Sequence, residues 1–340
     1  MSFELILPFL RPIESLLLDE SISEIMGNPD SRWSCEREGR LCEEPSVSFD
    51  AGKLRTGLEV IANQLGKKLD EDNPRLQAQL PDGSRLAAWI SPIVNPAPAV
   101  DIRKFTSRHF TVDDLITRGT LTQPIADLLA EQIRSGKTIL ISGGTGTGKT
   151  TLLRILANSI PDHERIIVIE DTPELHIRKP NIVPAQSVTD TNKKPVTFDD
   201  LLKDALRMRP DRIILGEVRG IEARTLLDSF NTGHAGSLAT IHANSAEKAL
   251  RRFANLVMRS HAQSTFSDTE AEIGEAVDFV IHVERQPGRR ILREVLAIRG
   301  YDRDAKRFLI EPVFGLKHGT PSDDRNSPST QLKETSYATA

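Results

Sequence analysis

The stretch Gly143-Gly144-Thr145-Gly146-Thr147-Gly148-Lys149-Thr150 fits the pattern G-x-x-x-x-G-K-S/T and decides the fold of this chain. An apolar strand over Thr138–Ser142 is predicted to lead into it, and a helix over Thr150–Asn158 to follow it. Glycines let backbone N–H groups curl around phosphate oxygens, and the positive end of the following helix strengthens that attraction. The sequence therefore predicts a phosphate-binding loop. Its candidate ligand-binding residues are Gly143, Gly144, Thr145, Gly146, Thr147, Gly148, Lys149, Thr150 and Thr151.

Two side chains of this loop have specific expected roles. Lys149 would bridge the β- and γ-phosphates of a nucleoside triphosphate, and the Thr150 hydroxyl would ligate Mg²⁺. A guanine-reading Asn-Lys-x-Asp motif would indicate GTP, but the nearest candidate, Asn192-Lys193-Lys194-Pro195, has proline where the carboxylate is needed. The sequence therefore favours ATP with Mg²⁺, although adenine itself has no readable motif.

Strands and helices alternate from residue 121 to residue 315, which is typical of a parallel sheet with helices on its faces. Beyond the first strand, the predicted strands are Ile166–Ile169, Arg212–Leu215, Ser237–Ile241, Phe279–Val283 and a hairpin of Ile291–Ile298 with Phe308–Val313. The predicted helices besides Thr150–Asn158 are Gln123–Ser135, Phe198–Met208, Glu222–Phe230 and Ala246–Ser260. Thr197 and Asp200 have the spacing of a helix-capping pair. We expect one α/β domain over residues 121–315.

Residues 1–105 are predicted to form a smaller α+β domain. Its predicted strands are Ile22–Met26, Trp33–Glu36, Leu76–Leu80, Arg85–Ile90 and Val100–Phe105. A helix over Lys53–Leu65 would align its apolar residues on one face, with Gly66 as its stop. Residues 106–120 are expected to link the two domains. Residues 316–340 offer little to bury and are expected to be a disordered tail.

Composition limits the classes of function. The 340 residues carry a net charge of −4, which argues against coating nucleic acid along most of the surface. The longest unbroken apolar stretch, Leu86–Ile90, is far shorter than the roughly 20 residues of a bilayer span. The opening residues lack the basic region of a signal peptide. Cys35 and Cys42 are too few for a disulfide framework or a four-cysteine zinc site, so a cytosolic protein is expected.

Chemically active residues follow the carboxyl ends of the predicted strands, where open α/β sheets bind ligands. Glu170 and Asp171 follow the second strand, Glu217 the third and His242 the fourth. Glu217 is the first candidate for the general base, and Glu170 is a second carboxylate that acts through metal-bound water or on the nucleophile. The sequence leaves open which of the two is the base, and both are candidate Mg²⁺-shell groups beside Thr150. His242 would report on the γ-phosphate, whereas Asp171 is expected to cap or fold back locally.

Three longer motifs behind the loop resemble those of the traffic ATPases of type II, type IV, conjugation and pilus machines. Residues 170–175 (EDTPEL) resemble the acidic box, residues 206–220 (LRMRPDRIILGEVRG) the Walker B segment, and residues 232–244 (TGHAGSLATIHAN) the histidine box of that family. The resemblance covers about Ile22 to Phe314. The RMRPDR wording and the lack of a tetracysteine element are most similar to the conjugal transfer ATPases of the TrbB group, with the tight-adherence pilus ATPases as neighbours.

This resemblance implies a RecA-like P-loop ATPase domain in a homohexameric ring on the cytoplasmic face of the inner membrane. Each nucleotide would lie between the two domains of one subunit, and hydrolysis would power conjugal DNA transfer or type IV secretion. A pilus assembly motor is the alternative. The implied partners are other copies of the chain and inner-membrane channel proteins. Membrane contact would be peripheral, and direct DNA contact is left open.

The resemblance also implies further site residues. His234 precedes its strand and by position alone is a turn residue or a subunit contact, but it belongs to the family's histidine box. Arg103 and Arg85 match arginine positions of the family that complete the γ-phosphate cage as arginine fingers. Gly216 stands where other P-loop ATPases have the Walker B aspartate. Mg²⁺ is therefore expected to bind Thr150 directly and the acids through water.

Two other functions are compatible with a phosphate loop. A small-molecule or nucleoside kinase usually opens with its loop, whereas 142 residues precede Gly143 here and no acceptor-binding region is evident. A nucleotide-gated assembly subunit with negligible turnover would not need Glu170 and Glu217. The basic clusters Arg251-Arg252 and Arg289-Arg290 with Arg293 are expected to be solvated faces rather than contacts to DNA, lipid or an acidic partner.

Overall fold

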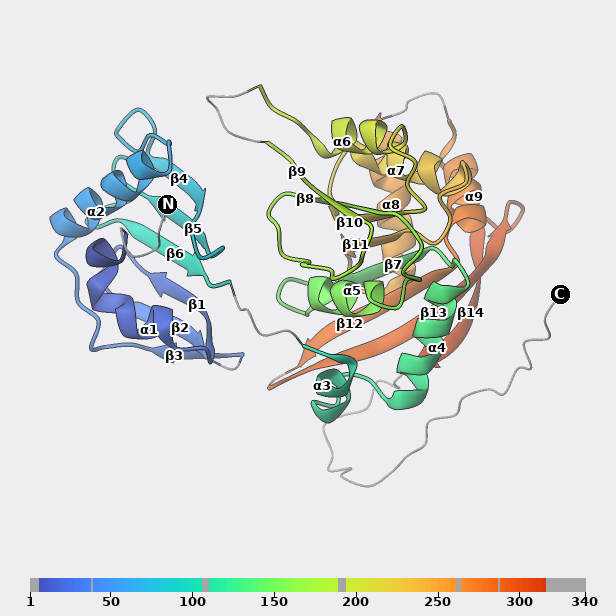
Figure 1. Cartoon of the computed structure of the whole chain (residues 1–340), viewed down its shortest axis with the longest axis horizontal. Helices are drawn as coiled ribbons and strands as arrows, with labels where there is room; N and C mark the ends of the chain where they lie inside the picture. Colours follow the sequence, from blue (N-terminus) through green and yellow to red (C-terminus); the bar gives the residue numbers. More distant parts are fainter. Residues whose placement is uncertain are drawn as a thin grey trace. The chain divides into compact units, whose positions relative to one another are not determined.

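The structure is a computed structural model that describes residues 6–37, 39–105, 110–188, 194–260, 264–286 and 288–315. The chain divides into two compact units, Met1–His109 and Phe110–Ala340, and each unit contains one β-sheet (Figure 1). The expected disordered tail over 316–340 lies outside the described residues.

The first unit is built on a six-stranded antiparallel sheet with the strand order β3-β2-β1-β6-β5-β4. Its elements are η2 (Leu7–Ile13), α1 (Glu14–Leu18), β1 (Ile22–Gly27), β2 (Trp33–Arg37), β3 (Arg40–Glu43), α2 (Ala51–Gln64), β4 (Arg75–Gln79), β5 (Arg85–Trp89) and β6 (Ala99–Arg103). Helix α2 begins where the Asp50 side chain accepts a 2.9 Å hydrogen bond from the Lys53 N–H. Its buried face contributes Leu54, Leu58 and Ile61 to the core, as the spacing predicts.

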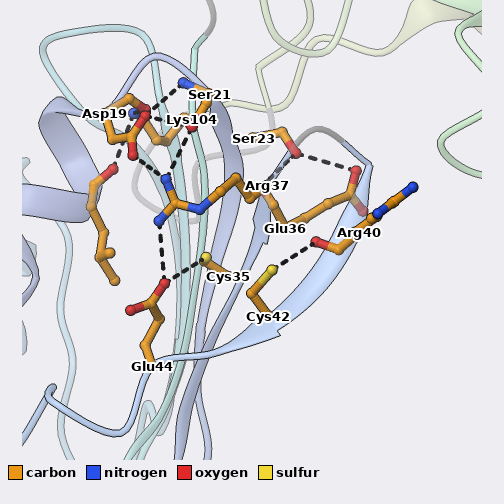
Figure 2. Close-up of polar contacts among 11 residues, drawn as sticks. Asp19, Ser21, Ser23, Cys35, Glu36, Arg37, Arg40, Cys42, Glu44 and Lys104 are labelled. Carbon is orange, nitrogen blue, oxygen red and sulfur yellow. Dashed lines mark hydrogen bonds and ion pairs between the residues drawn. The ribbon is translucent and has the colours of Figure 1, made fainter. Parts of the chain in front are cut away.

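A polar network joins the edge of this sheet to α1 (Figure 2). Arg37 forms ion pairs with Asp19 and with Glu44, and the Cys35 thiol donates a 3.1 Å hydrogen bond to the same Glu44 carboxylate. Burial and the neighbouring Glu44 raise the pKa of Cys35 to about 11. Lys104 donates from Nζ to two backbone carbonyls at the end of α1, at 3.1 and 2.6 Å. Cys35 is therefore an unreactive core thiol at neutral pH.

The second unit is built on an eight-stranded sheet with the order β14-β13-β12-β7-β11-β10-β8-β9. Its strands are β7 (Ile139–Gly143), β8 (Ile166–Glu170), β9 (Ile182–Gln186), β10 (Arg212–Val218), β11 (Leu238–His242), β12 (Phe279–Gln286), β13 (Arg289–Asp302) and β14 (Arg307–Gly315). The strands from β12 to β9 pair in parallel, and β13 and β14 add an antiparallel edge. The sequence predicts this arrangement, a parallel sheet in an α/β domain with a hairpin at one edge.

Helices cover both faces of this sheet (Figure 1). The helices are α3 (Val112–Thr117), α4 (Gln123–Arg134), α5 (Lys149–Ala157), α6 (Phe198–Ala205), α7 (Glu222–Asn231), α8 (Ala246–Ser260) and α9 (Phe266–Ala276). The first three pack in one core cluster and the last four in another. Successive residues of β7 alternate between the clusters, because Leu140 belongs to one and its neighbours Ile139 and Ile141 to the other.

Capping chemistry explains several helix starts. Thr197 and Asp200 form the predicted capping box at α6, with the Thr197 N–H donating to Asp200 at 2.9 Å and the Asp200 N–H donating back at 3.2 Å. The same box, from Thr111 and Asp114, begins α3 inside the segment expected to be a linker. Residues 112–117 of that segment therefore form a helix in the second unit, because Leu115 is buried in its core.

Further elements are absent from the sequence-based prediction, namely η2, α1, β3, β9, α9 and the hairpin of β12 with β13. β9 is the edge strand of the second sheet and contains Pro184, which an edge position tolerates. Among the described residues, none of the helices has the length and apolar character needed to cross a membrane.

Candidate active site

The phosphate loop connects β7 to α5 and depends on its glycines. A Cβ at Gly143 would lie 2.5 Å from the Val283 carbonyl oxygen and 2.6 Å from Thr147 Oγ1, so no larger residue fits. Gly148 immediately precedes α5 with a φ of +90°, a conformation that glycine adopts without strain. The local sequence therefore fixes both the close packing of the loop against β12 and its sharp entry into the helix.

The side chains of Lys149 and Thr147 share one acceptor. Lys149 Nζ donates to the Gly144 carbonyl at 2.8 Å, and Thr147 Oγ1 donates to the same oxygen at 2.9 Å. Both side chains are buried. If the ammonium moves to a phosphate, the threonine hydroxyl still satisfies the carbonyl, so the loop keeps its shape when the lysine changes partner.

The register of the sheet brings the strand-end residues to one edge. Strands β7, β11, β10 and β8 are consecutive, and His242 at the end of β11 lies directly opposite Gly143. Glu170 ends β8. Glu217 lies inside β10, where the pairing with β11 is irregular between Leu215 and Val218. The structure therefore brings Glu170, Glu217 and His242 to the same edge as the phosphate loop.

Glu217 makes contacts through both carboxylate oxygens. Its Oε1 lies 3.1 Å from His242 Nε2, and its Oε2 accepts a 2.7 Å bond from Arg219, whose guanidinium also donates to Asp171 at 2.7 Å. Burial and the nearby Lys149 ammonium lower the pKa of His242, against the opposing effect of Glu217. The imidazole is therefore neutral at pH 7, and a proton on Nε2 lets it donate to the carboxylate.

Glu170 is held beside the backbone of the segment that follows it. It is 7% exposed, and its Oε1 accepts hydrogen bonds from the Glu174 and Leu175 N–H groups, both at 3.0 Å. Burial raises its pKa to about 7, even though these two bonds act in the opposite direction. A Cβ at Gly216 would lie 3.3 Å from Glu170 Cγ, which explains a glycine at the usual aspartate position.

The raised pKa predicts how stability depends on pH. The folded state binds the Glu170 proton more tightly than the unfolded chain does, since burial raises the pKa of this carboxyl from 4.5 to about 7. The contribution of protonated Glu170 to the free energy of unfolding is therefore fully present below pH 4.5 and is lost as the pH rises through about 7. Glu170→Gln is permanently neutral and keeps the Oε1 acceptor. We expect it to be more stable than the parent by about 3 kcal/mol near pH 8.5 and equally stable near pH 4.5. Calorimetric melting at both pH values measures this, and a gain that is equal at both would contradict it.

His234 lies away from these groups. It occupies the turn before β11, where its backbone carbonyl accepts a 2.7 Å hydrogen bond from the Ser237 hydroxyl. The same Ser237 Oγ accepts a hydrogen bond from the Ile213 N–H at the start of β10. Both ring nitrogens are buried, and within the described part of the chain neither has a hydrogen-bond partner. Burial lowers the pKa of His234. The structure thus places His234 at the amino ends of the strands, at the edge of the sheet far from the phosphate loop, as its position in the sequence indicates.

Arg85 and Arg103 belong to the first unit and are neighbours there. They lie directly opposite each other on β5 and β6, and Glu24 on β1 lies opposite Arg103. These residues alternate with core residues such as Leu86 and Ile102, so they project from the face of the sheet that is turned away from the core. The two arginines and Glu24 therefore lie on neighbouring strands of the same face of the sheet.

Two features near the loop are missing from the sequence-based site. His282 lies opposite Ser142 in the register, with Nδ1 2.9 Å from Ser142 Oγ, and burial lowers its pKa. A cavity of about 570 Å³, a size typical of small-ligand sites, is lined by Gly144, residues 243–245 and the carboxyl end of β12. His282 lies within the predicted strand Phe279–Val283. The sequence does not show that this strand pairs with β7, and that pairing is what places His282 beneath the loop.

A glycine-rich loop with a buried lysine, beside acids on neighbouring strand ends, defines a P-loop nucleotide-binding domain. The chain belongs to the family described as "Type II/IV secretion system protein", which matches residues 10–295.

Two relatives and one solved structure illustrate this membership. The conjugal transfer protein TrbB of Rhizobium radiobacter is 38% identical over 289 residues, which cover 83% of this chain and 85% of the relative. The type IV secretion system protein VirB11 of Bartonella quintana is 33% identical over 330 residues, covering 86% and 92%. The structure of the Legionella pneumophila ATPase DotB has a TM-score of 0.59 at 21% identity, covering 87% and 81%, and shows the fold alone.

Proposed function

We propose that this chain is an ATP hydrolase with a RecA-like P-loop domain that powers type IV secretion, and conjugal DNA transfer in particular. The observation that carries the proposal is the contact of Glu217 with His242, since His242 lies opposite the first residue of the phosphate loop. The similarity to TrbB over most of both chains favours conjugation over the alternative of pilus assembly.

The residues of this edge have distinct parts in the proposed hydrolysis. The loop N–H groups and Lys149 hold the phosphates, and Glu217 orients the water and accepts its proton. Neutral His242 holds Glu217 in position and senses the γ-phosphate. Glu170, with a pKa of about 7, is the second carboxylate and the alternative base.

The donor set also fits Mg²⁺, which takes oxygen ligands and keeps several waters. The Thr150 hydroxyl would bind the ion directly, and Glu217 and Glu170 would bind it through water. Within the described ranges, no group of three or more His, Cys, Asp or Glu side chains is arranged to hold a metal by itself, which suits an ion shared with phosphate oxygens. When bound, Mg²⁺ neutralises the charge of the β- and γ-phosphates.

The first unit supplies arginine fingers in this proposal. Arg85 and Arg103 lie directly opposite each other on neighbouring strands, and their guanidinium groups are the donors that would meet the γ-phosphate. Arg103 is exposed and Arg85 is half-buried, so both can offer donors to an anion.

We further propose a homohexameric ring bound peripherally to the cytoplasmic face of the inner membrane, with channel proteins as partners. The support is the family and its conjugal and type IV secretion relatives. His234 is a candidate for a subunit contact, because this half-buried residue lies in the turn at the opposite edge of the sheet from the loop.

The hydrolysis reaction has a simple test. The purified chain is expected to release phosphate from ATP with water as the sole acceptor, because Glu217 and the loop lie at one edge. A coupled phosphate assay measures this without any added acceptor. A kinase would release none under these conditions, and a nucleotide-gated subunit would bind ATP without turnover.

A further inference from the structure

The hairpin of β12 and β13 lies against the phosphate loop. Arg290 Nε donates a 2.9 Å hydrogen bond to the Gly146 carbonyl. A Cβ at Gly146 would lie 3.2 Å from Arg285 NH1, and a Cβ at Gly148 would lie 3.3 Å from Arg290 Cδ. Arg290 is exposed, as the prediction of a solvated face implies, and its guanidinium in addition contacts the loop backbone.

This bond fixes the orientation of one loop peptide. In a trans peptide the C=O and the following N–H point in opposite directions. Holding the Gly146 carbonyl on the hairpin side therefore turns the Thr147 N–H away from the hairpin, toward the interior of the loop. Inward N–H groups are what such a loop offers to phosphate oxygens.

Arg285 and Arg290 also form a like-charged pair. They lie directly opposite each other across the hairpin, and each lies beside a glycine of the phosphate loop. The adjacent pair is different, since Arg289 donates from Nε to Gln286, its partner across the hairpin, at 3.0 Å. Of these two pairs, only the first lies against the glycines of the loop.

We propose that Arg285 and Arg290 form a cationic clamp, in the same domain as the phosphate loop, that is specific for the β-phosphate of the nucleotide. Arg290 is a positioning residue that holds the Gly146 peptide, and the pair adds positive charge beside the loop. The clamp acts within each subunit and is distinct from the arginines of the first unit. It rests on the proposed use of residues 143–151 as the nucleotide site.

The test compares Arg290→Ala with Arg289→Ala in the full chain. Arginines 289 and 290 are adjacent, exposed and on the same hairpin, but Arg289 bonds to Gln286. We expect Arg290→Ala to raise the Kd for ADP about tenfold, and Arg289→Ala to change it less than about twofold. AMP lacks the β-phosphate, so its Kd should be equal in the two variants. The kcat at saturating ATP should fall less than about threefold, because the clamp affects binding.

Charge and geometry are separated by two further variants. Arg290→Lys keeps the charge without the fixed Nε–H, so it should recover part of the ADP affinity. Arg285→Ala should raise the Kd about threefold at low salt, with a smaller effect at high salt. A loss of affinity for ADP and AMP alike would show a general loosening of the loop and overturn the clamp.

Lys149→Ala distinguishes failure of the clamp from failure of the site. If Lys149→Ala binds ADP as tightly as the parent, the nucleotide site itself is misassigned. If Lys149→Ala loses ADP while Arg290→Ala binds it as Arg289→Ala does, the clamp alone is overturned. Circular dichroism checks that each variant is folded, and Arg290→Lys decides the question if the alanine variant is not.

Discussion

Glu217→Gln is expected to lower ATP turnover about 10²- to 10⁴-fold while nucleotide binding stays unchanged. The amide cannot accept a proton from water, so the base is lost. It has the same shape and keeps an oxygen for the 3.1 Å contact with His242, whereas the oxygen that accepts from Arg219 is replaced by the amide nitrogen. Phosphate release gives kcat, and calorimetric titration with ADP and ATP gives the affinities.

Asp171→Asn is the matched control for this substitution. Asp171 and Glu217 bind the same Arg219 side chain, each at 2.7 Å, so both variants weaken Arg219 equally while only one removes the base. We expect Asp171→Asn to retain kcat within about threefold. Unchanged hydrolysis in Glu217→Gln would exclude Glu217 as the base and direct attention to Glu170, whose pKa of about 7 suits that role.

Replacing Arg103 or Arg85 by alanine is expected to lower kcat about a hundredfold or more, with ADP binding little changed. An arginine finger stabilises charge on the γ-phosphate, which ADP lacks. Because Glu24 lies opposite Arg103 on β1, the melting temperature of the first unit is measured beside kcat, so that a structural loss is distinguished from a catalytic one. Tryptophan fluorescence follows that unit, because Trp33 and Trp89 both belong to it.

Arg75→Ala serves as the control for this pair. Arg75 is an exposed arginine at the start of β4, whereas Gln79, which pairs with Arg85, is at the end of that strand. By this register Arg75 and Arg85 lie on the same face of the sheet. It should leave kcat within about twofold of the parent, since it lies remote from the pair. Full activity in both Arg103→Ala and Arg85→Ala would remove the first unit from the proposed catalytic cycle.

The sequence predicts the site where local pattern and sheet topology agree. The phosphate loop is readable because glycine and lysine spacing is a local property, and Glu170 and His242 are readable because each ends a strand. The position of Glu217 is only partly predictable. Its strand continues to Val218 through an irregularity that the Thr240 hydroxyl stabilises by donating to the Gly216 carbonyl at 2.5 Å.

The missed features depend on contacts between distant segments. Arg290 and Gly146 are far apart in the sequence, and the residues around each of them do not predict the hydrogen bond between them. By contrast, α3 and α9 were predictable, since Thr111 and Thr265 each precede an aspartate at capping distance, as Thr197 does at α6. A threonine followed three residues later by an aspartate begins a helix at all three of these positions.

The shared carbonyl of Gly144 has a consequence for the exchange of product for fresh substrate. Because Lys149 has a backbone partner within the loop, its buried ammonium does not depend on a phosphate for a hydrogen bond. Departure of ADP is then a swap of one acceptor for another, with the Thr147 hydroxyl keeping the carbonyl occupied in both states. The loop thus carries an internal acceptor for the lysine, and the geometry of the loop backbone does not depend on which acceptor the ammonium uses.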